Sequence, residues 1–442
     1  MNHPSPRHTA AASAAGALGV LELPADDPRL AADLVARTAA WCPHPFGVRI
    51  RPGVTVDTTA LASVSVVLLG DPTRTARDFP DATVFAEAGS VATARAAIAG
   101  GAAGILARGA ECGGVIGSLG TFVLLQQLLA DPEITVPVWA WGGIGQDTAA
   151  AAVVGGAAGV VLDTQFALYP DAGLPVATVD ALAGLDGSET LVWNGVRVLR
   201  RGQRATAPPA DLAARLGPDP RTQYLPVGQD AALATSFHTR WPTIGAAVRG
   251  VRAAVRALIA DDLPATALTT GGAALGTALP VAQGPMTRVS DQPGFAAAVA
   301  AAGGLPFLAL ALSTADQARE MMSRTKKRLG DAPWGVGILG FADEPVRAAQ
   351  LEVVRELRPT HAIIAGGRPA QAAALEADGI TTYLHVPSPG LLRQFLAAGA
   401  RRFVFEGAEC GGHVGPRNSF PLWQSRRSTG GPRCGEQCAA PV

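Results

Sequence analysis

Short apolar runs rich in β-branched residues alternate with alanine-rich, helix-favouring stretches along most of this 442-residue chain. We predict seven strands in the first part, at 19–23, 46–50, 65–69, 83–88, 104–108, 136–140 and 159–163, and six in the second, at 280–284, 306–310, 334–339, 361–365, 381–386 and 402–406. This alternation is typical of βα units, in which helices cover a parallel sheet. The predicted fold class is therefore α/β.

One segment occurs twice in the chain. Residues 109–117 read GAECGGVIG, and residues 407–415 read GAECGGHVG. Upstream segments return in the same order, because AGALG at 15–19 is matched by AGGLP at 302–306, and FGVRI at 46–50 by WGVGI at 334–338. Two copies of one fold are predicted from this repeat.

Neither copy carries a full set of eight strands. Aligned on the repeated motifs, the first copy lacks its opening strand and the second lacks its last two. A closed barrel pairs its last strand with its first, so a missing strand leaves sheet edges open. One possible closure is that 280–284, the strand missing from the first copy, pairs with 19–23 and 159–163.

The predicted division of the chain follows these copies: a first copy at 10–190, a linker at 191–277, a second copy at 278–423 and a disordered tail at 424–442. The tail is assigned because the sequence loses its periodicity there. The linker contains a predicted amphipathic helix from Trp241 to Ala260, with apolar residues every three or four positions. We interpret it as a packed linker helix whose basic face, with Arg249, Arg252 and Arg256, is solvated.

Composition narrows the function classes. With 48% hydrophobic residues, 16% charged residues and zero formal net charge, the chain has no evident attraction to nucleic acid or to anionic membranes. An odd number of cysteines, five, favours a reducing compartment, and we expect a cytoplasmic protein. Cys434 and Cys438 lack a second ligand pair, so no metal site is predicted. Cys112 and Cys410, in matching glycine turns, are expected to be packed residues rather than reactive thiols.

Two successive predicted strands end in turns suited to phosphate. VPVWAWGGIG at 136–145 ends in Gly142 and Gly143 before a helix, and GVVLDTQF at 159–166 ends in Asp163 and Thr164. In an eight-stranded (β/α) barrel, the loops after strands seven and eight place backbone N–H groups at a helix N-terminus, where they bind phosphate. Ordinary βα turns that need glycine for positive φ remain the alternative.

These segments resemble the nitronate monooxygenases, formerly called 2-nitropropane dioxygenases, and the related barrel-type enoyl reductases. The family segment P-V-x-x-x-G-G-I is matched at 137–144, its G-T-x-F motif by DTQF at 163–166, and its E-x-G-G-H-x-G motif at 409–415. PVAQGPM at 280–286 looks like the family's first strand, which ends against the flavin ring. The resemblance covers most of 10–190 and 278–423 and implies a TIM-barrel fold and FMN as cofactor.

The resemblance makes His413 the expected catalytic base. A histidine that titrates near neutrality can take the proton from the carbon beside a nitro or nitronate group while flavin accepts the electrons. Gln283, Gly284, Met286 and His385 are the expected flavin contacts of the second copy. A histidine in a glycine-rich loop can also be a mere hydrogen-bonding residue.

The first copy departs from the family pattern. Val115 stands at the histidine position and cannot transfer a proton, so the first copy should lack the proton-abstraction step. The resemblance implies a polar flavin contact on the third strand and lysine on the fifth. The first copy has Arg49 and Glu87 there, which could form an ion pair across an empty pocket, and the second has Gly337 and His385.

Three functions stay open at this point. The first is an FMN-dependent oxidoreductase that oxidises alkyl nitronates with oxygen. The second is an NADPH- and FMN-dependent enoyl-reductase-like module acting on an enoyl thioester, because the tandem copies look like segments fused to type I polyketide synthases. The third is a catalytically silent scaffold, favoured by Val115 and the missing strands.

Overall fold

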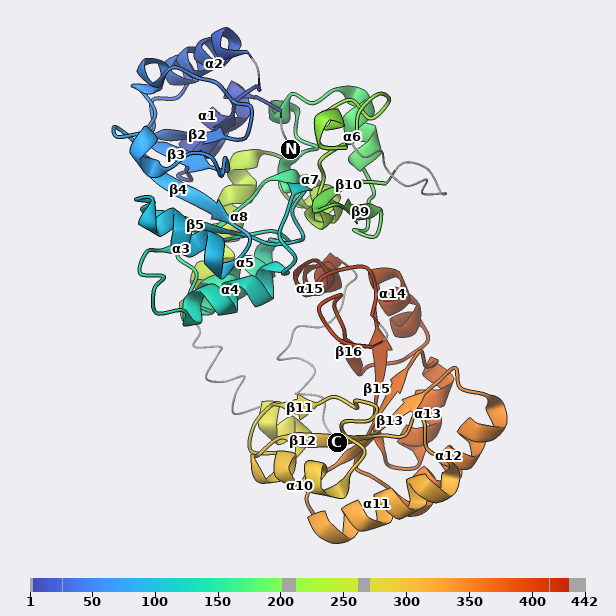
Figure 1. Cartoon of the computed structure of the whole chain (residues 1–442). Coiled ribbons are helices and arrows are strands. Elements are labelled where there is room, and N and C mark those ends of the chain that lie inside the picture. Colours follow the sequence, from blue (N-terminus) through green and yellow to red (C-terminus); the bar gives the residue numbers. More distant parts are fainter. Residues whose placement is uncertain (1–2, 26, 201–211, 261–270, 413, 429–442) are drawn as a thin grey trace. The chain divides into compact units, whose positions relative to one another are not determined.

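The computed structural model describes residues 3–25, 27–200, 212–260, 271–412 and 414–428. Two compact units are present (Figure 1). The first unit comprises 1–261 with 407–409 and 416–425, and the second comprises 262–406 with 410–415 and 426–442. A short part of the second copy, around 416–425, thus packs with the first unit.

The first unit is built on a curled, seven-stranded parallel sheet in the order β1-β2-β3-β4-β5-β7-β8. Its strands are β1 (Gly19–Glu22), β2 (Phe46–Ile50), β3 (Val66–Leu69), β4 (Thr83–Ala88), β5 (Gly104–Arg108), β7 (Val138–Trp141) and β8 (Gly159–Val161). Each strand pairs with its neighbours in register, for example Glu22 opposite Arg49. All seven predicted strands of this copy are confirmed, and β1 and β8 are the two edges of an open barrel.

The second unit holds a six-stranded parallel sheet in the order β11-β12-β13-β14-β15-β16. Its strands are β11 (Ala282–Gln283), β12 (Leu305–Ala309), β13 (Gly335–Leu339), β14 (His361–Ala365), β15 (Thr381–Val386) and β16 (Phe403–Phe405). Ala282 pairs with Leu305, so the closure of the first copy by 280–284 is wrong. The short β11 pairs instead with the strand that follows it in the sequence.

Both units contain helices as well as strands. In the first unit they are α1 (Pro6–Ala14), α2 (Pro28–Trp41), α3 (Val91–Ala99), α4 (Thr121–Ala130), α5 (Gln146–Val154), α6 (Val176–Leu182), α7 (Ala234–Arg240) and α8 (Ile244–Ala260). In the second they are α10 (Pro293–Ala301), α11 (Ala315–Leu329), α12 (Glu344–Leu357), α13 (Pro369–Ala377) and α14 (Pro389–Ala397). No helix in the described part of the chain is long and apolar enough to cross a lipid bilayer.

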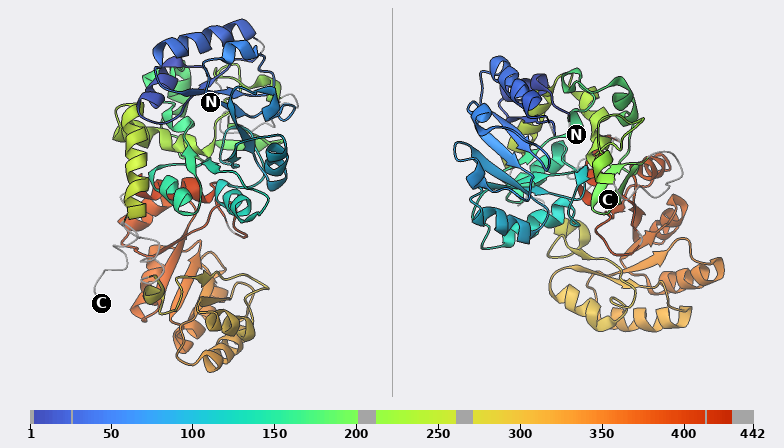
Figure 2. Two further views of the ribbon diagram at one scale, coloured as in Figure 1. Left: turned by 90° about the vertical axis from the view of Figure 1, so that its left-hand side faces the viewer. Right: turned by 45° about the horizontal axis from the view of Figure 1, so that its top comes forward.

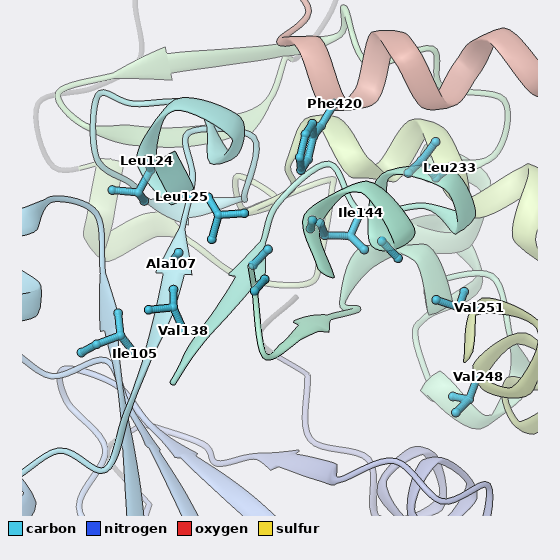
Figure 3. Packing of buried hydrophobic residues seen from close by; sticks show 14 of the residues in the cluster. Ile105, Ala107, Leu124, Leu125, Val138, Ile144, Leu233, Val248, Val251 and Phe420 are labelled. Atoms are coloured by element: carbon cyan, nitrogen blue, oxygen red, sulfur yellow. The ribbon is translucent and has the colours of Figure 1, made fainter. Parts of the chain in front are cut away.

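Alternating strand residues separate the core from the barrel interior. Ile105, Ala107 and Val138 point outward and are buried among helix residues that include Leu124 and Leu125 (Figure 3). Side chains one position along each strand point into the barrel. The outward set forms the hydrophobic core, and the inward set is left to form a site.

Of the predicted linker, the described residues up to 260 belong to the first unit and those from 271 on belong to the second. Thr190–Trp193 (β9) and Val196–Leu199 (β10) form a hairpin through Asn194 and Gly195, whose φ values of 47° and 75° suit a tight turn. The helix α8 buries Ile244, Val248 and Val251 in the core of the first unit and packs against α5 (Figure 2). Its apolar stripe is buried because the alanine-rich α5 offers a matching apolar face.

The expected disordered tail is wrong at its start. Ser419–Ser428 forms the helix α15, so 424–428 are helical. The periodicity rule missed this helix because it is short and its burial depends on a partner far away in the sequence. Residues 429–442 lie outside the described part of the chain.

The placement of α8 can be tested by truncating its buried face. Ile244→Ala should lower the free energy of unfolding by about 2–5 kcal/mol, because Ile244 is fully buried and the substitution leaves a cavity. The control is Ile259→Ala on the same helix, where the side chain is 59% exposed and the change should stay within about 0.5 kcal/mol. Urea unfolding measures both, and equal effects would contradict the packing of α8.

Candidate functional site

The interior of the first barrel has two layers of side chains. Nearer the amino ends of the strands lie apolar residues, among them Phe85, Leu106 and Trp139. At the carboxyl ends, where family resemblance predicts the flavin ring, lie Glu22, Arg49, Glu87, Arg108 and Trp141. The mouth of this barrel is therefore lined by charge and by one indole ring.

Arg49 and Glu87 form the predicted ion pair. Arg49 Nε lies 2.5 Å from Glu87 Oε1, and Nη2 donates to Oε2 at 2.9 Å. Glu22 lies 3.4 Å from Arg49 Nη1, and Arg108 Nε lies 3.2 Å from Glu87 Oε2. Burial alone would raise the pKa of Glu87, but Arg49 and Arg108 outweigh it and hold that pKa below its ordinary value.

Trp141 fills the rest of the mouth. The guanidinium carbons of Arg49 and Arg108 lie 4.8 Å and 5.1 Å from the centroid of its ring. The ring is itself 3% exposed. The carboxyl ends of these strands are therefore occupied by this cluster of side chains.

The loop that bears Val115 is held by hydrogen bonds and by strand pairing within the first unit. Arg108 donates to the carbonyl oxygens of Gly113 and Val115. Gly114–Val115 forms β6, which pairs with β10 so that Val115 lies opposite Val196. A Cβ on Gly113 would lie 2.1 Å from the carbonyl oxygen of Pro226, which packs over the loop. Val115, which cannot abstract a proton, thus lies in a loop that is fixed by its pairing with β10.

The repeated glutamate is structural, which sequence reasoning missed. Glu111 Oε2 accepts from Thr121 N at 2.8 Å and from Thr121 Oγ1 at 2.7 Å. Glu409 Oε2 accepts from Ser419 N at 2.9 Å and from its hydroxyl at 3.1 Å. Each carboxylate therefore caps the helix that follows its loop. The signal was a Thr or Ser ten residues after the glutamate in both copies.

The glycine turn after β7 was predicted to bind phosphate. Gly142 and Gly143 have φ values of 121° and 67°, as the sequence predicts for this turn, and the helix α5 begins just after it. Gln424 Oε1 accepts from the backbone N–H of Asp147 at 2.8 Å and of Thr148 at 3.2 Å. The donors that would bind a phosphate at this helix N-terminus are therefore engaged by the chain's own carboxamide.

The glycines of this turn make room for α15. A Cβ on Gly145 would lie 2.2 Å from the Gln424 side chain, and a Cβ on Gly143 would lie 2.7 Å from Pro421. Phe420 reaches from α15 toward Ile144 (Figure 3). Close approach, the property expected of these glycines, is thus used by a helix. An FMN phosphate does not fit this turn in the observed arrangement.

Asp163 and Thr164 are brought beside the glycine turn as predicted. Gln165 links this segment to the glycine turn. Its Nε2 donates to Ile144 O at 2.7 Å, and its Oε1 accepts from Asp163 N at 2.7 Å. Thr164 is buried and begins a short 3-10 turn. Burial would raise the pKa of Asp163, but nearby positive charges, Arg49 among them, hold it below its ordinary value.

A buried acid beneath this region was not predicted. Asp230 is 1% exposed, and its Oδ1 has no hydrogen-bond partner in the described part of the structure. Burial, reinforced by the charge of Asp163, raises the pKa of Asp230 to about 7. Only the fold reveals this group, because the sequence around it carries no recognisable motif.

The mouth of the second barrel is different. Strand register places Ala309, Gly337, His385 and Glu406 where the first copy has Glu22, Arg49, Glu87 and Arg108. Two charged side chains are thus replaced by Ala and Gly. His385 is buried, and its Nε2 lies 2.7 Å from Glu406 Oε2 without hydrogen-bond geometry. These strand ends therefore carry fewer charged side chains, and Pro285 packs against Gly337, where a Cβ would lie 2.2 Å from it.

The other predicted flavin contacts of the second copy lie in different environments. Gln283 ends β11 and its Oε1 accepts from Phe307 N at 3.2 Å, while a Cβ on Gly284 would meet no atom within 4 Å. Met286 is 43% exposed and lies in a turn whose carbonyl accepts from Ser290 N, so its side chain is not enclosed at the strand ends. His413 lies outside the described residues.

The cysteines in the described part of the chain are Cys42, Cys112 and Cys410. Burial raises the pKa of the Cys112 thiol well above its ordinary value, which fits the predicted packing role. Cys410 is exposed, so the packing role expected for it is wrong. No group of three or more metal-ligating side chains occurs among the described residues, and Cys434 and Cys438 lie outside them.

Comparisons with known proteins agree with this architecture. A sequence model of the nitronate monooxygenase family matches residues 22–208 and 269–350. A nitronate monooxygenase of Pseudomonas aeruginosa is 30% identical over 179 residues, covering 32% of this chain and 50% of that protein. The chain thus spans half the length of that curated relative.

The solved structure of FabK shows the same fold. FabK from Thermotoga maritima is 22% identical, with 60% of this chain and 92% of that chain covered and a TM-score of 0.50. Nitroalkane oxidase from Streptomyces ansochromogenes is 21% identical, with 57% and 84% covered and a TM-score of 0.39.

The contact between Gln424 and α5 can be tested by removing the carboxamide. Gln424→Ala should lower the free energy of unfolding by about 1–3 kcal/mol, because two backbone N–H groups in a largely buried place lose their acceptor. Trp423→Ala, at a neighbouring side chain that is 62% exposed, is the matched control and should change it by about 0.5 kcal/mol at most. Denaturant unfolding measures the free energy of unfolding of both variants. A Gln424→Ala variant as stable as the parent would refute the contact.

The raised pKa of Asp230 predicts a pH dependence of stability. The folded chain keeps a proton that the unfolded chain releases near the ordinary value of about 3.9, so stability should fall as pH rises from about 4 to about 7. Asp230→Asn should remove this slope, worth up to about 4 kcal/mol, while the exposed Asp81→Asn should keep it. Unfolding curves at several pH values measure the slope, and an unchanged slope in Asp230→Asn would be the contrary result.

Proposed function

The chain belongs to the nitronate monooxygenase family, a family of flavin-dependent enzymes, and we propose that it acts as an oxidoreductase of that type through its second copy. The proposed substrate is an alkyl nitronate, with FMN as cofactor and oxygen as electron acceptor. The contrast between the two barrel mouths is the observation that carries this proposal. One mouth is filled by charged side chains, and the other has the uncharged Ala309 and Gly337 at the same positions, where Pro285 packs so closely that a Cβ on Gly337 would lie 2.2 Å from it.

The loop that bears His413 supports the same assignment. A Cβ on Gly411 or Gly412 would meet no atom within 4 Å, whereas the corresponding Gly113 is packed against Pro226. Gly412 has a φ of 94°, which favours glycine at that position. Gly411 and Gly412 are therefore not packed against other described atoms, whereas Gly415 of the same loop packs against Pro387.

His413 would hold the proton taken from the carbon beside the nitro group, and His385 would orient a ligand through its ring nitrogen near Glu406. Gln283 and Gly284 would line the mouth at the end of β11. When bound, the flavin would supply the electron acceptor for the substrate. A phosphate turn for the second copy is not found among the described residues, and the turn in the first copy does not fit a phosphate in the observed arrangement.

The second candidate is a catalytically silent scaffold. It is favoured by the engagement of the phosphate turn with Gln424 and by the filled mouth of the first unit. A flavin enzyme absorbs visible light through its bound flavin, whereas a scaffold without flavin does not. If the purified chain is colourless after incubation with FMN and gel filtration, the scaffold is correct for both copies.

The proposed activity predicts a sharp difference between equivalent substitutions. His413→Ala should lower kcat/KM for an alkyl nitronate by about 10²-fold or more, with flavin absorbance retained, because the proton acceptor is lost. Val115→Ala at the equivalent position of the first copy should leave kcat/KM within about twofold. Oxygen consumption with nitronate measures both effects.

Two results would contradict the proposed reaction. Equal loss in both variants, or no loss in His413→Ala, would remove the second copy from catalysis. Flavin reduction that requires NADPH, without nitronate-dependent oxygen uptake, would favour an enoyl-reductase-like module instead.

A further inference from the structure

The open edges of the first barrel enclose a cavity of about 680 Å³. It lies in the first unit, between β1 and β8, where the missing strand of a closed barrel would run. Among the described residues, neither edge pairs with a further strand. This volume is within the range of small-molecule sites, about 300–1,000 Å³.

The walls of this cavity are mostly apolar. One side is formed by barrel-interior side chains and the other by the inner face of α8. Its apolar lining includes Leu18, Val20, Leu68, Phe85, Leu106, Trp139, Val160, Leu162, Val248, Val251 and Val255. The lining also includes His3, Ser5 and His8 from the amino-terminal segment, but apolar residues predominate and favour an alkyl or aryl group by the hydrophobic effect.

The two ends of the cavity differ in charge. Glu22, Arg49 and Asp163 line it at the carboxyl ends of β1, β2 and β8, where charges of both signs are paired. Arg252 and Arg256, one helical turn apart on α8, line it at the other end, where Arg252 Nη1 lies 3.3 Å from Gly16 O. Neither arginine forms an ion pair with an acidic residue in the described part of the chain. Two like charges at i, i+4 repel each other unless an anion lies between them.

We infer that this cavity binds a straight-chain alkyl carboxylate of the fatty-acid class, with its tail along the apolar wall and its carboxylate at Arg252 and Arg256. The carboxylate is placed at Arg252 and Arg256 because neither of them is paired with a carboxylate of the described chain, whereas Arg49 at the opposite end is already paired with Glu22 and Glu87. The site is separate from the proposed nitronate site, because it lies in the first unit and needs neither His413 nor a flavin. It uses the space that opens because the first copy lacks a strand.

The test is calorimetric titration of the full chain with alkanoates from octanoate to hexadecanoate, each below its micelle concentration. One saturating site per chain is expected. Affinity should rise by about fourfold for each added methylene until the tail outgrows the cavity, because each buried methylene contributes its transfer free energy. The uncharged alcohol of the best chain length should bind at least about tenfold more weakly, because it cannot form charge-assisted hydrogen bonds with arginine.

Variants on one helix separate the site from general hydrophobic adsorption. Val255→Trp should abolish binding by filling the cavity. Arg252→Glu with Arg256→Glu should weaken it by at least about tenfold, while Arg249→Glu, on the same helix but outside the lining, should bind like the parent. Circular dichroism of each variant checks that α8 is still formed.

The proposal is overturned by any of three results: no saturable binding to the folded parent chain, equal binding by Val255→Trp, or equal weakening by Arg249→Glu and the double variant. Displacement of the alkanoate by FMN would also overturn it, because the cavity would then be a flavin site. Nitronate oxidation measured in the same variants keeps the two proposals distinct, since Val255→Trp should leave it unchanged.

Discussion

A parallel sheet that stops at seven strands cannot close, and much of the first unit follows from that constraint. The edges β1 and β8 stay apart, and the amphipathic helix α8 covers the gap from outside. Its arginines and valines then become walls of the cavity. A segment that looks like a linker in the sequence is in this way an essential wall of the unit.

The same unit replaces ligand interactions with interactions of its own chain. Gln424 supplies the acceptor that a phosphate would supply at the start of α5, and Arg49, Glu87 and Trp141 occupy the mouth. Buried charges of this kind are tolerated because each carboxylate is paired with a guanidinium group.

The two copies share a backbone and differ in what that backbone holds. Glu111 and Glu409 cap the following helix in the same way, so the repeat preserves a structural contact. Ala309 and Gly337 differ from Glu22 and Arg49, so the site itself has diverged. Family membership consequently describes both copies, while the proposed chemistry belongs to one.

The sequence by itself determined the strands, the repeat, the ion pair of Arg49 with Glu87 and the loss of a proton acceptor at Val115. These features are encoded locally, by apolar runs, by residue identity and by spacing. Only the tertiary structure decided the partner of β11, the helix at 419–428, the role of Gln424 and the raised pKa of Asp230. Each of these depends on groups far apart in the chain or on burial, and periodicity in a single segment carries no information about either.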